Sequence, residues 1–429
     1  MWKLLVVLLV YKTNAKCYWN SKCPYRLFGT KTPYEAVRGD VRDIPALEQC
    51  EPVSVWMMMR HGTRHPEVDE IAQMKAVVEL RTDILKAHEE GRGEMCAQDI
   101  QNLRKWTWNK NLDASPSDLT VEGMEELQSI GSRFGEKFSN VLEHMQQYKI
   151  RASIELRTQM SAKAFVKGLQ RNNQTLNIST SFPNDLTARP YRYCKRRFYD
   201  ILIGDKIPEE TAKYLQSRDF LKVLTSVQKR TGLTNALSPK TILQIYDLCR
   251  FYRSYSIRLS DAWCALFSDS DLKALEYVED VQHYYRNGHG DPMNAKLGAS
   301  SLKDLYQKFV QGTQGINSFS GYFSHDTMLG MLYAALGIYA DTPVISGFER
   351  VKKRQWRTSF LTPYAANFVA VLNRCNDSTG SIYKVQFLIN EMELHLCNKR
   401  ACDWDEFVKQ FEPFTRNDLS FCNETRLIS

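Results

Sequence analysis

The stretch Val53–Pro66, which reads VSVWMMMRHGTRHP, decides the fold. Its first seven residues are apolar or small, and a short run of this kind bounded by polar residues predicts a buried strand of an α/β sheet. The run leads directly into the cluster Arg60, His61, Gly62, Thr63, Arg64 and His65. Because ligands of open α/β sheets bind beyond the carboxyl ends of the strands, this order predicts a ligand site at the edge of a sheet.

The composition of this cluster favours a phosphate site. Arg60 and Arg64 lie four residues apart, and a guanidinium group pairs with phosphate oxygens through two parallel hydrogen bonds. The imidazole of His61 can attack phosphorus through a neutral ring nitrogen, and Gly62 lets the backbone turn tightly. A lone Arg-His pair is more often a solvated basic turn, but Arg-His-Gly-x-Arg directly after an apolar strand is rare by chance.

A second cluster, Arg157 and Thr158, follows a strand candidate at 151–156 and opens a helical pattern at 158–169. The N-terminal amides of a helix attract anions, so Arg157 would add a third guanidinium at such a site. Taken alone, the pair is more simply a helix start capped by Thr158, since threonine is a favoured capping residue.

A third cluster, His325 and Asp326, lies between a strand pattern at 318–323 and a helical pattern at 327–336. His325 can donate a hydrogen bond to a phosphate oxygen, and Asp326 can act as the general acid that protonates the leaving oxygen. Asp326 by itself fits a helix cap equally well.

Together the three clusters describe phosphoryl transfer without a metal. Arg60, Arg64, Arg157 and His325 would neutralise the equatorial phosphoryl oxygens, and Asp326 would protonate the leaving group on the far side. The sequence has no Walker loop, no HExxH pattern and no dense Asp/His spacing, so we expect neither a metal nor another cofactor.

The order of the patterns predicts an α/β core with a helical insertion. Strand and helix patterns alternate in 16–189 and 313–429, whereas 190–312 carries long helical patterns that we interpret as an inserted cap. Within the core we also expect helices at 71–90 and 119–147, the second capped by Thr120, and strands at 176–181, 365–372 and 383–388.

The charge of the chain favours acidic partners without naming them, because basic residues usually form a solvated face. The 429 residues include 57 basic and 49 acidic ones, a net charge of +8. The basic runs 195–197 and 352–354 are short and lack the interleaved aromatic residues of a nucleic-acid surface. We therefore expect a small phosphorylated substrate and no nucleic acid, and the sequence does not indicate the oligomeric state.

Several features predict passage through the secretory pathway. Residues 1–15 combine an early lysine, a short apolar run and a small-residue exit, which is typical of a cleaved signal peptide and too short for a membrane anchor. The eleven cysteines lack CxxC pairs, which favours disulfides and leaves at least one cysteine over. Glycosylation triplets begin at Asn173, Asn177, Asn376 and Asn423, and the C-terminus is no retention signal, so we expect a secreted or lumenal glycoprotein.

The three clusters resemble the signature of the histidine acid phosphatases, the branch that includes phytases and multiple inositol polyphosphate phosphatases. The matching segments are RHGTRHP from Arg60, RTQMSAKAF from Arg157 and SHDTML from Ser324. CAQDIQNLRKW, LTVEGMEEL, LTPYAANFVAVLNRC and VQFLINEMEL are similar to the inositol polyphosphate phosphatases in particular.

The resemblance implies a phosphoglycerate-mutase-like central sheet flanked by helices, with a helical cap that shapes the substrate pocket. It implies that His61 accepts the phosphoryl group and that Asp326 is the proton donor. Arg60, Arg64, Arg157 and His325 would form the phosphate clamp. The implied activity is hydrolysis of phosphate monoesters, above all inositol polyphosphates such as phytate, through a phosphohistidine.

The third segment differs from that of the inositol polyphosphate phosphatases, so the resemblance does not determine the substrate. Inositol polyphosphate phosphatases usually have His-Ala-Glu in the third segment, whereas this chain has His325-Asp326-Thr327, the form typical of phytases and general acid phosphatases. A broad-specificity acid phosphatase and a non-catalytic anion-binding protein are the alternatives, although a pure binder needs neither His61 nor Asp326. The basic runs 195–197 and 352–354 could hold extra phosphate groups or form a solvated surface.

Overall fold

The computed structural model describes residues 17, 26–170, 176–180, 182, 185–255, 262–377 and 380–423. The predicted signal peptide, the triplet at Asn173 and Cys23 lie outside these ranges. Within them, no helix is both long enough and apolar enough to cross a bilayer.

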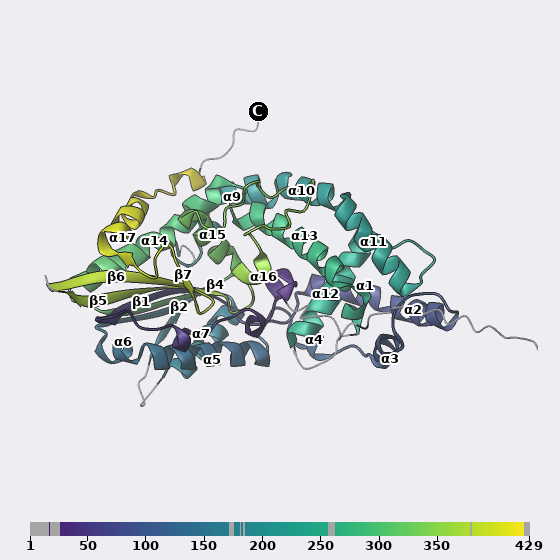
Figure 1. Cartoon of the computed structure of the whole chain (residues 1–429), viewed down its shortest axis with the longest axis horizontal. Coiled ribbons are helices and arrows are strands. Elements are labelled where there is room, and N and C mark those ends of the chain that lie inside the picture. The colour runs from purple at the N-terminus through teal and green to yellow at the C-terminus, as the bar shows by residue number, and fades with distance from the viewer. Residues whose placement is uncertain are drawn as a thin grey trace, which may run out of the picture.

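A mixed eight-stranded sheet forms the centre of the fold (Figure 1). In spatial order its strands are β3 (Ile178–Thr180), β2 (Gln147–Ala152), β4 (Ser318–Ser324), β1 (Cys50–Arg60), β5 (Asn367–Asp377), β6 (Gly380–Ile389) and β7 (Met392–Leu394), and β8 (Cys402–Asp403) pairs with β6. The first four strands are parallel to their neighbours, and the β1–β5 pair begins the antiparallel part.

The register of the parallel strands brings three carboxyl ends to one edge of the sheet. Arg60 of β1 lies opposite Ser324 of β4, and Phe323 of β4 lies opposite Ala152 of β2. The residues that follow these strands therefore start from neighbouring positions, although they are far apart along the chain.

Helices cover both faces of the sheet (Figure 1). One face carries α5 (Val121–Lys137), α6 (Ser139–His144) and α7 (Leu156–Leu169), and the other carries α14 (Pro292–Thr313), α15 (Asp326–Leu336) and α17 (Trp404–Phe411). From Val53 to Met59, β1 is apolar except for Ser54, as expected of a strand buried on both sides: Met57 and Met59 pack into one core cluster, and Trp56 and Met58 into the other.

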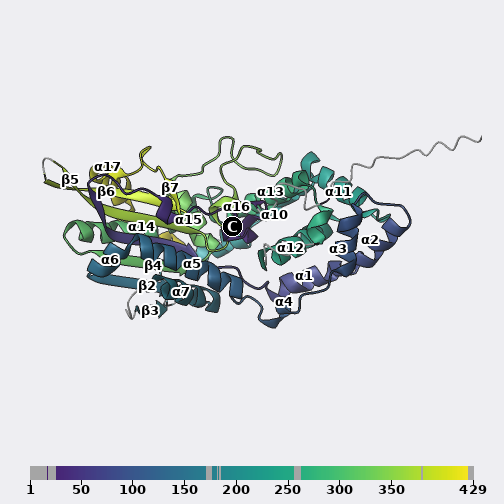
Figure 2. The same ribbon diagram turned by 60° about the horizontal axis from the view of Figure 1, so that its bottom comes forward.

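The remaining long helices gather at one end of the molecule, away from the antiparallel strands (Figure 2). They come from two parts of the chain: α1 (Val68–Val78), α2 (Leu80–Glu89), α3 (Ala97–Lys105) and α4 (Asn111–Ala114), and α10 (Lys206–Leu215), α11 (Arg218–Thr231), α12 (Pro239–Tyr255) and α13 (Asp269–Asn287). α1 packs on α12, and α2 on α11. The predicted cap boundaries, residues 190 and 312, remain a prediction. The helices of 68–114 also pack against the helices α10 to α13, whereas α14 covers the sheet.

Short helical elements connect these layers. They are the helices α8 (Pro190–Tyr193), α9 (Lys195–Arg197) and α16 (Thr358–Leu361), the π-helix η6 (Phe198–Leu202), and the 3₁₀ turns η3 (Gly29–Lys31), η4 (Tyr34–Ala36), η5 (Val41–Asp43), η7 (Trp263–Leu266), η8 (Glu412–Arg416) and η9 (Ser420–Asn423).

Most expected elements are present, and the differences lie at their ends. The predicted helices 71–90 and 119–147 are each divided into two, and Thr120 caps α5 by accepting from the Gly123 amide. The strand expected at 151–156 is wrong in its second half, because β2 ends at Ala152 and α7 begins at Leu156. Leu156 is apolar but half exposed on a helix start, which a periodicity argument cannot distinguish from a strand end.

Five disulfides join ten of the eleven cysteines: Cys17–Cys96, Cys50–Cys375, Cys194–Cys422, Cys249–Cys264 and Cys397–Cys402. Cys194–Cys422 ties the start of α9 to the end of the described chain, and Cys50–Cys375 joins β1 to β5. Such a set is typical of proteins that fold in an oxidising compartment. The side chains of Asn177, Asn376 and Asn423 are exposed.

Candidate active site

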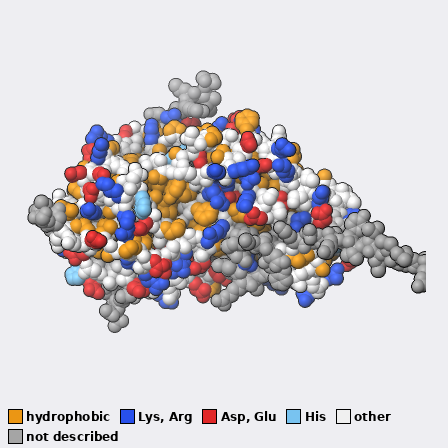
Figure 3. Space-filling model, in the orientation of Figure 1, with side chains coloured by type: hydrophobic (Ala, Val, Ile, Leu, Met, Phe, Trp, Pro, Cys, Tyr) orange, Lys and Arg blue, Asp and Glu red, His pale blue; other side chains and the backbone are white. Residues whose placement is uncertain are grey.

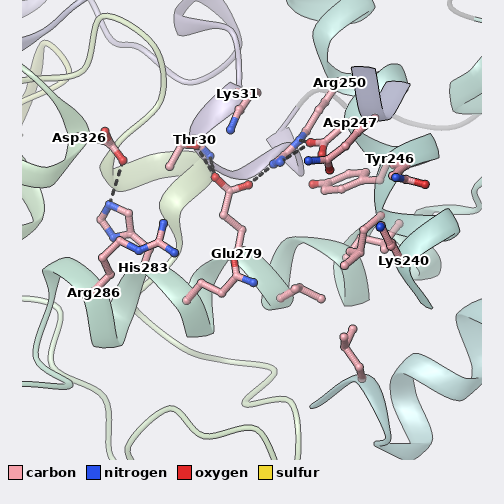
Figure 4. Close-up of a pocket in the computed structure, with 17 residues that line it drawn as sticks. Thr30, Lys31, Lys240, Tyr246, Asp247, Arg250, Glu279, His283, Arg286 and Asp326 are labelled. Atoms are coloured by element: carbon pink, nitrogen blue, oxygen red, sulfur yellow. Dashed lines mark hydrogen bonds and ion pairs between the residues drawn. The ribbon is translucent and has the colours of Figure 1, made fainter. Parts of the chain in front are cut away.

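A pocket of about 590 Å³ opens at the carboxyl ends of β1 and β4. Its lining includes the six residues that the sequence singled out: Arg60, His61, Arg64, Arg157, His325 and Asp326. The structure therefore brings the three clusters together around one cavity, which we call the active-site pocket. A neighbouring cavity of about 430 Å³, the side pocket, shares Thr30, Lys31, Arg286 and Asp326 with it (Figure 4).

Arg60 is fixed at the end of β1 by neutral groups. Its Nη1 donates to the carbonyl oxygens of Thr30 and, at 2.8 Å, of Thr362, and its guanidinium lies 4.7 Å from the ring centroid of Tyr364. Only 3% of the residue is exposed. Among the described residues no carboxylate forms an ion pair with Arg60, so its charge is available to an anion in the pocket.

His61 is held as a neutral imidazole with one free nitrogen. Its Nδ1 lies 2.8 Å from the Gly62 carbonyl oxygen, and because a carbonyl only accepts, Nδ1 carries the hydrogen and Nε2 keeps its lone pair. Burial, together with the charges of Arg60, His325 and Arg157, lowers the pKa of His61 well below 6.5. A neutral ring with an unprotonated Nε2 is the form that a nucleophile requires.

The loop that carries His61 is packed against α5 and α7. The Gly62 amide donates to Ser161 Oγ at 3.1 Å, and the Thr63 amide and hydroxyl donate to the carboxylate of Glu126 at 2.8 and 2.9 Å. A Cβ on Gly62 would lie 2.5 Å from the carbonyl oxygen of Gly123. Glycine is therefore required here for close approach to α5, whereas the sequence suggested a tight turn; Gly62 is not among the residues with positive φ.

The two other arginines differ in their partners. Arg64 forms an ion pair of 3.0 Å with Glu70, and the carboxylate of Glu70 has its pKa lowered to about 2 because Lys31 and Arg64 outweigh the effect of burial. Arg157 is the second residue of α7, whereas the sequence predicted it directly after a strand. Burial and the charges of Arg64 and Arg60 lower its pKa, as expected where several cations lie close together.

The sequence left open whether Thr158 and Asp326 are helix caps, and the structure answers this for both. The N-cap of α7 is Glu155, and Thr158 donates its hydroxyl to the backbone of Ser153 and Glu155 instead of capping. The N-cap of α15 is His325, whose side chain makes no capping hydrogen bond, and Asp326 is the first residue of the helix. The carboxylate of Asp326 is thus free to face the pocket.

His325 and Asp326 each have a partner that the sequence did not indicate. Nε2 of His325 lies 3.2 Å from Glu155, which also pairs with Arg189 at 2.6 Å. Oδ2 of Asp326 lies 3.5 Å from Nε2 of His283 on α13 (Figure 4). Burial raises the pKa of Asp326, but His283 and the charge of Arg60 outweigh it and lower the pKa well below 3.8.

A second group of cations lines the same pocket opposite the sheet: Arg192, Lys195, Arg197 and Arg286, from α8, α9 and α13. Lysine and arginine side chains also gather on the face of the molecule over this helical region (Figure 3). Of the two basic runs considered from sequence, Lys195 and Arg197 face the pocket, whereas Arg354 is buried in ion pairs with Glu276 and Asp280.

The one group of potential metal ligands in the described ranges is Cys17, Cys96 and Asp99. Its two cysteines are joined in a disulfide and offer no thiolate. The expectation that the reaction needs no metal stays a prediction.

Comparison with known proteins places this architecture in a family. The model of the histidine phosphatase superfamily (branch 2) matches residues 53–390. The chain belongs to that superfamily.

Individual relatives and solved structures show which members of the superfamily the chain is similar to. Multiple inositol polyphosphate phosphatase 1 of Drosophila melanogaster is 28% identical over 431 residues, covering 97% of this chain and 91% of that protein. The crystal structure of the phytase from D. castellii has a TM-score of 0.75 at 15% identity, covering 94% of this chain and 88% of that one. That of Bifidobacterium longum multiple inositol polyphosphate phosphatase in complex with inositol hexasulfate has a TM-score of 0.63 at 14% identity, covering 86% and 92%. The predicted fold class and family resemblance are confirmed.

Proposed function

We propose that the protein is a phosphomonoesterase that removes phosphate groups from inositol polyphosphates through a phosphohistidine on His61. The observation that carries the proposal is the convergence of Arg60, His61, Arg157 and Asp326 on one pocket. The membership of the superfamily and the likeness to multiple inositol polyphosphate phosphatase 1 support it.

In the first step, Arg60, Arg64 and Arg157 bind the phosphoryl oxygens, and Nε2 of His61 attacks phosphorus. The bond from phosphorus to the ester oxygen breaks, its electron pair stays on that oxygen, and Asp326 gives the oxygen a proton. His325 donates its Nε2 hydrogen to Glu155 and can bind a phosphoryl oxygen through Nδ1 when the negative charge of the substrate stabilises a second proton on the ring.

In the second step, the ionised Asp326 takes a proton from a water molecule as that water attacks the phosphohistidine. The bond from phosphorus to Nε2 breaks and its electron pair returns to His61. The backbone acceptor at Gly62 keeps the hydrogen on Nδ1 throughout, so His61 leaves the cycle in the form in which it entered.

The cations opposite the sheet support a substrate with several phosphate groups. Arg197 is only 3% exposed, and its Nη2 donates to two neutral oxygens, the Arg286 carbonyl at 3.0 Å and Asn287 Oδ1 at 2.9 Å. Burial lowers its pKa to about 10, and no described carboxylate forms an ion pair with it. A buried guanidinium without a counter-ion is costly until an anion reaches it, and a second phosphate group of the substrate supplies that anion.

Two alternatives remain. The sequence His325-Asp326-Thr327 favours a broad-specificity acid phosphatase, because it is shared with general acid phosphatases in the resemblance described above. A non-catalytic anion-binding protein is disfavoured, because a binder gains nothing from a neutral His61 with a free Nε2.

The deciding experiment compares phosphate release from inositol hexakisphosphate, p-nitrophenyl phosphate and glycerol 2-phosphate by the purified protein. We expect the highest kcat/KM for inositol hexakisphosphate. A kcat/KM that is higher for the two simple esters supports the broad-specificity phosphatase instead, and no release from any of them supports the binding protein.

We also propose that the protein is secreted or resides in the lumen of the secretory pathway. The five disulfides and the exposed residues Asn177, Asn376 and Asn423, which begin glycosylation triplets, support this location. Secretion of the full chain from cultured cells, with a mobility shift on treatment with a glycosidase, tests it.

A further inference from the structure

His283 is a buried imidazole that no sequence motif singled out. Only 4% of the residue is exposed, and neither ring nitrogen has a hydrogen-bond partner among the described residues. The carboxylate of Asp326 faces it, with Oδ2 3.5 Å from Nε2 (Figure 4). Because buried polar nitrogens without partners are costly and rare in native proteins, this placement requires an explanation.

Two glycines and a tryptophan determine the position of the His283 ring. Gly330 lies four residues after Asp326, on the same face of α15, and a Cβ on Gly330 would lie 2.8 Å from Cε1 of His283. The indole ring of Trp356 lies 5.8 Å from the imidazole, centroid to centroid. Gly288 in turn makes room for Trp356, because a Cβ there would lie 2.4 Å from Cζ2 of the indole. The ring is thus positioned next to Asp326 by three segments of the chain.

The other charged groups around this pair are cations or are already engaged. Arg60 and His325 act on Asp326 from β1 and from the end of β4, and Arg286 lines both pockets from α13. The acidic residues of α13 nearest to His283 in sequence are Glu279 and Asp280. Glu279 pairs with Arg250 and accepts from Thr30 (Figure 4), and Asp280 pairs with Arg354. Asp326 is therefore the carboxylate available to His283 among the described residues.

We propose that His283 and Asp326 act as one proton-sharing pair and that this pair, not a lone carboxylate, supplies the proton for the leaving group. Before phosphoryl transfer the pair holds one proton, which exchanges between Nε2 of His283 and Oδ2 of Asp326. As the bond to phosphorus breaks, this shared proton passes from His283 by way of Asp326 to the ester oxygen. In the second step Asp326 takes a proton from the attacking water, and the pair regains the proton that it lost.

The consequence is that phosphoryl transfer to His61 can proceed over a wider pH range. An imidazole ordinarily keeps its proton about two pH units higher than a carboxylic acid does. A pair that contains an imidazole therefore retains its shared proton at a pH where an isolated aspartate has lost it. His283 acts through Asp326 and is a positioning residue, so the effect appears in the pH profile more than in substrate binding.

The test uses His283→Gln, which keeps a polar side chain of similar reach but cannot be protonated. The quantity measured is kcat/KM against pH for glycerol 2-phosphate, whose alkoxide leaves only with a proton, and for p-nitrophenyl phosphate, whose phenolate leaves without one. We expect the basic limb for glycerol 2-phosphate to move about one pH unit towards acid, which is roughly a tenfold loss at pH 7, with a smaller change for p-nitrophenyl phosphate.

Two further variants make the result specific. Lys273→Gln changes an exposed residue of α13 outside the lining of both pockets and should leave both profiles unchanged. Gly330→Ala places a methyl group against the ring without removing a titratable group, and it should shift the basic limb in the same direction even if His283→Gln proves unstable in a thermal melt. Unshifted basic limbs in both variants, or an equal loss for both substrates at every pH, would overturn the proposal. Neither result touches the proposed inositol polyphosphate specificity, because both substrates are simple esters.

Discussion

The active-site pocket has two walls of different origin. The sheet wall consists of Arg60, His61, Arg64, Arg157 and His325, which follow β1, β2 and β4 at one edge of the sheet. The helical wall consists of Arg192, Lys195, Arg197, His283 and Arg286, which come from α8, α9 and α13 and line the active-site pocket or the side pocket.

The two walls also differ in how their charges are balanced. In the sheet wall, Arg64 and His325 have carboxylate partners, Glu70 and Glu155, that hold them in place, whereas Arg60 is held by carbonyl oxygens. In the helical wall, Arg197 has neutral acceptors, and the nitrogens of His283 have no hydrogen-bond partner among the described residues beyond the 3.5 Å contact with Asp326. The difference suggests that the sheet wall performs phosphoryl transfer on a rigid support, and that the helical wall selects the substrate and controls the proton.

Removing the nucleophile from the sheet wall is the largest change that this comparison predicts. His61→Ala should lower kcat by roughly 10³-fold or more on every substrate, because no other neutral imidazole in the pocket has its Nε2 free. Acid quench of the wild-type enzyme with ³²P-labelled substrate should trap a phosphohistidine that this variant lacks. A variant with wild-type turnover would remove His61 from the mechanism.

The proton donor, which lies between the two walls, comes next. Asp326→Asn should lower kcat/KM for glycerol 2-phosphate by about 10²- to 10³-fold. The loss for p-nitrophenyl phosphate should be smaller, since its phenolate needs no proton to leave. An equal loss on both esters would mean that Asp326 supports the structure of the site and does not donate the proton.

The sheet wall could be predicted from the sequence because each of its parts is local. An apolar strand followed by charged residues is a contiguous pattern, and parallel strands place their carboxyl ends together whatever the length of chain between them. The end of β2 was harder to place, because Leu156 continues the apolar pattern into α7.

The helical wall could not be predicted in the same way. Arg197 and Arg196 are adjacent in one basic run, yet Arg197 is buried at the pocket and Arg196 pairs with Asp200. Nothing in the sequence around His283 relates it to Asp326, because their contact depends on how α13 packs against α15. Glycines 288 and 330, which make that packing possible, carry no signal of their own.

The helical wall predicts an effect on substrate selection. Arg197→Gln should raise KM for inositol hexakisphosphate about tenfold or more, because it removes a charge-assisted contact to a second phosphate group. KM for p-nitrophenyl phosphate, which has one phosphate group, should hardly change. Arg196→Gln is the matched control, since it alters the neighbouring arginine outside the pocket lining. Equal changes in KM for the two substrates would show that Arg197 does not contact a second phosphate.

The last prediction concerns the support of the sheet wall and its effect on stability, not on activity. Glu126 accepts from both the amide and the hydroxyl of Thr63, and burial raises its pKa from 4.5 to about 7. Because the folded-state pKa lies above the unfolded value, Glu126 stabilises the fold below about pH 4.5, and this stability is lost as the pH rises to 7. The loss is of order 2–3 kcal/mol in the free energy of unfolding.

Glu126→Gln removes this titration while keeping an acceptor for the Thr63 amide. Its free energy of unfolding, from urea titrations between pH 4.5 and 8, should fall less steeply with pH than that of the wild type, and the variant should be the more stable of the two above pH 7. Parallel pH dependences would show that the carboxylate of Glu126 is already ionised at low pH. The hydrogen bonds from Thr63 would then be to a charged acceptor, and the loop that carries His61 would be held more tightly than the raised pKa implies.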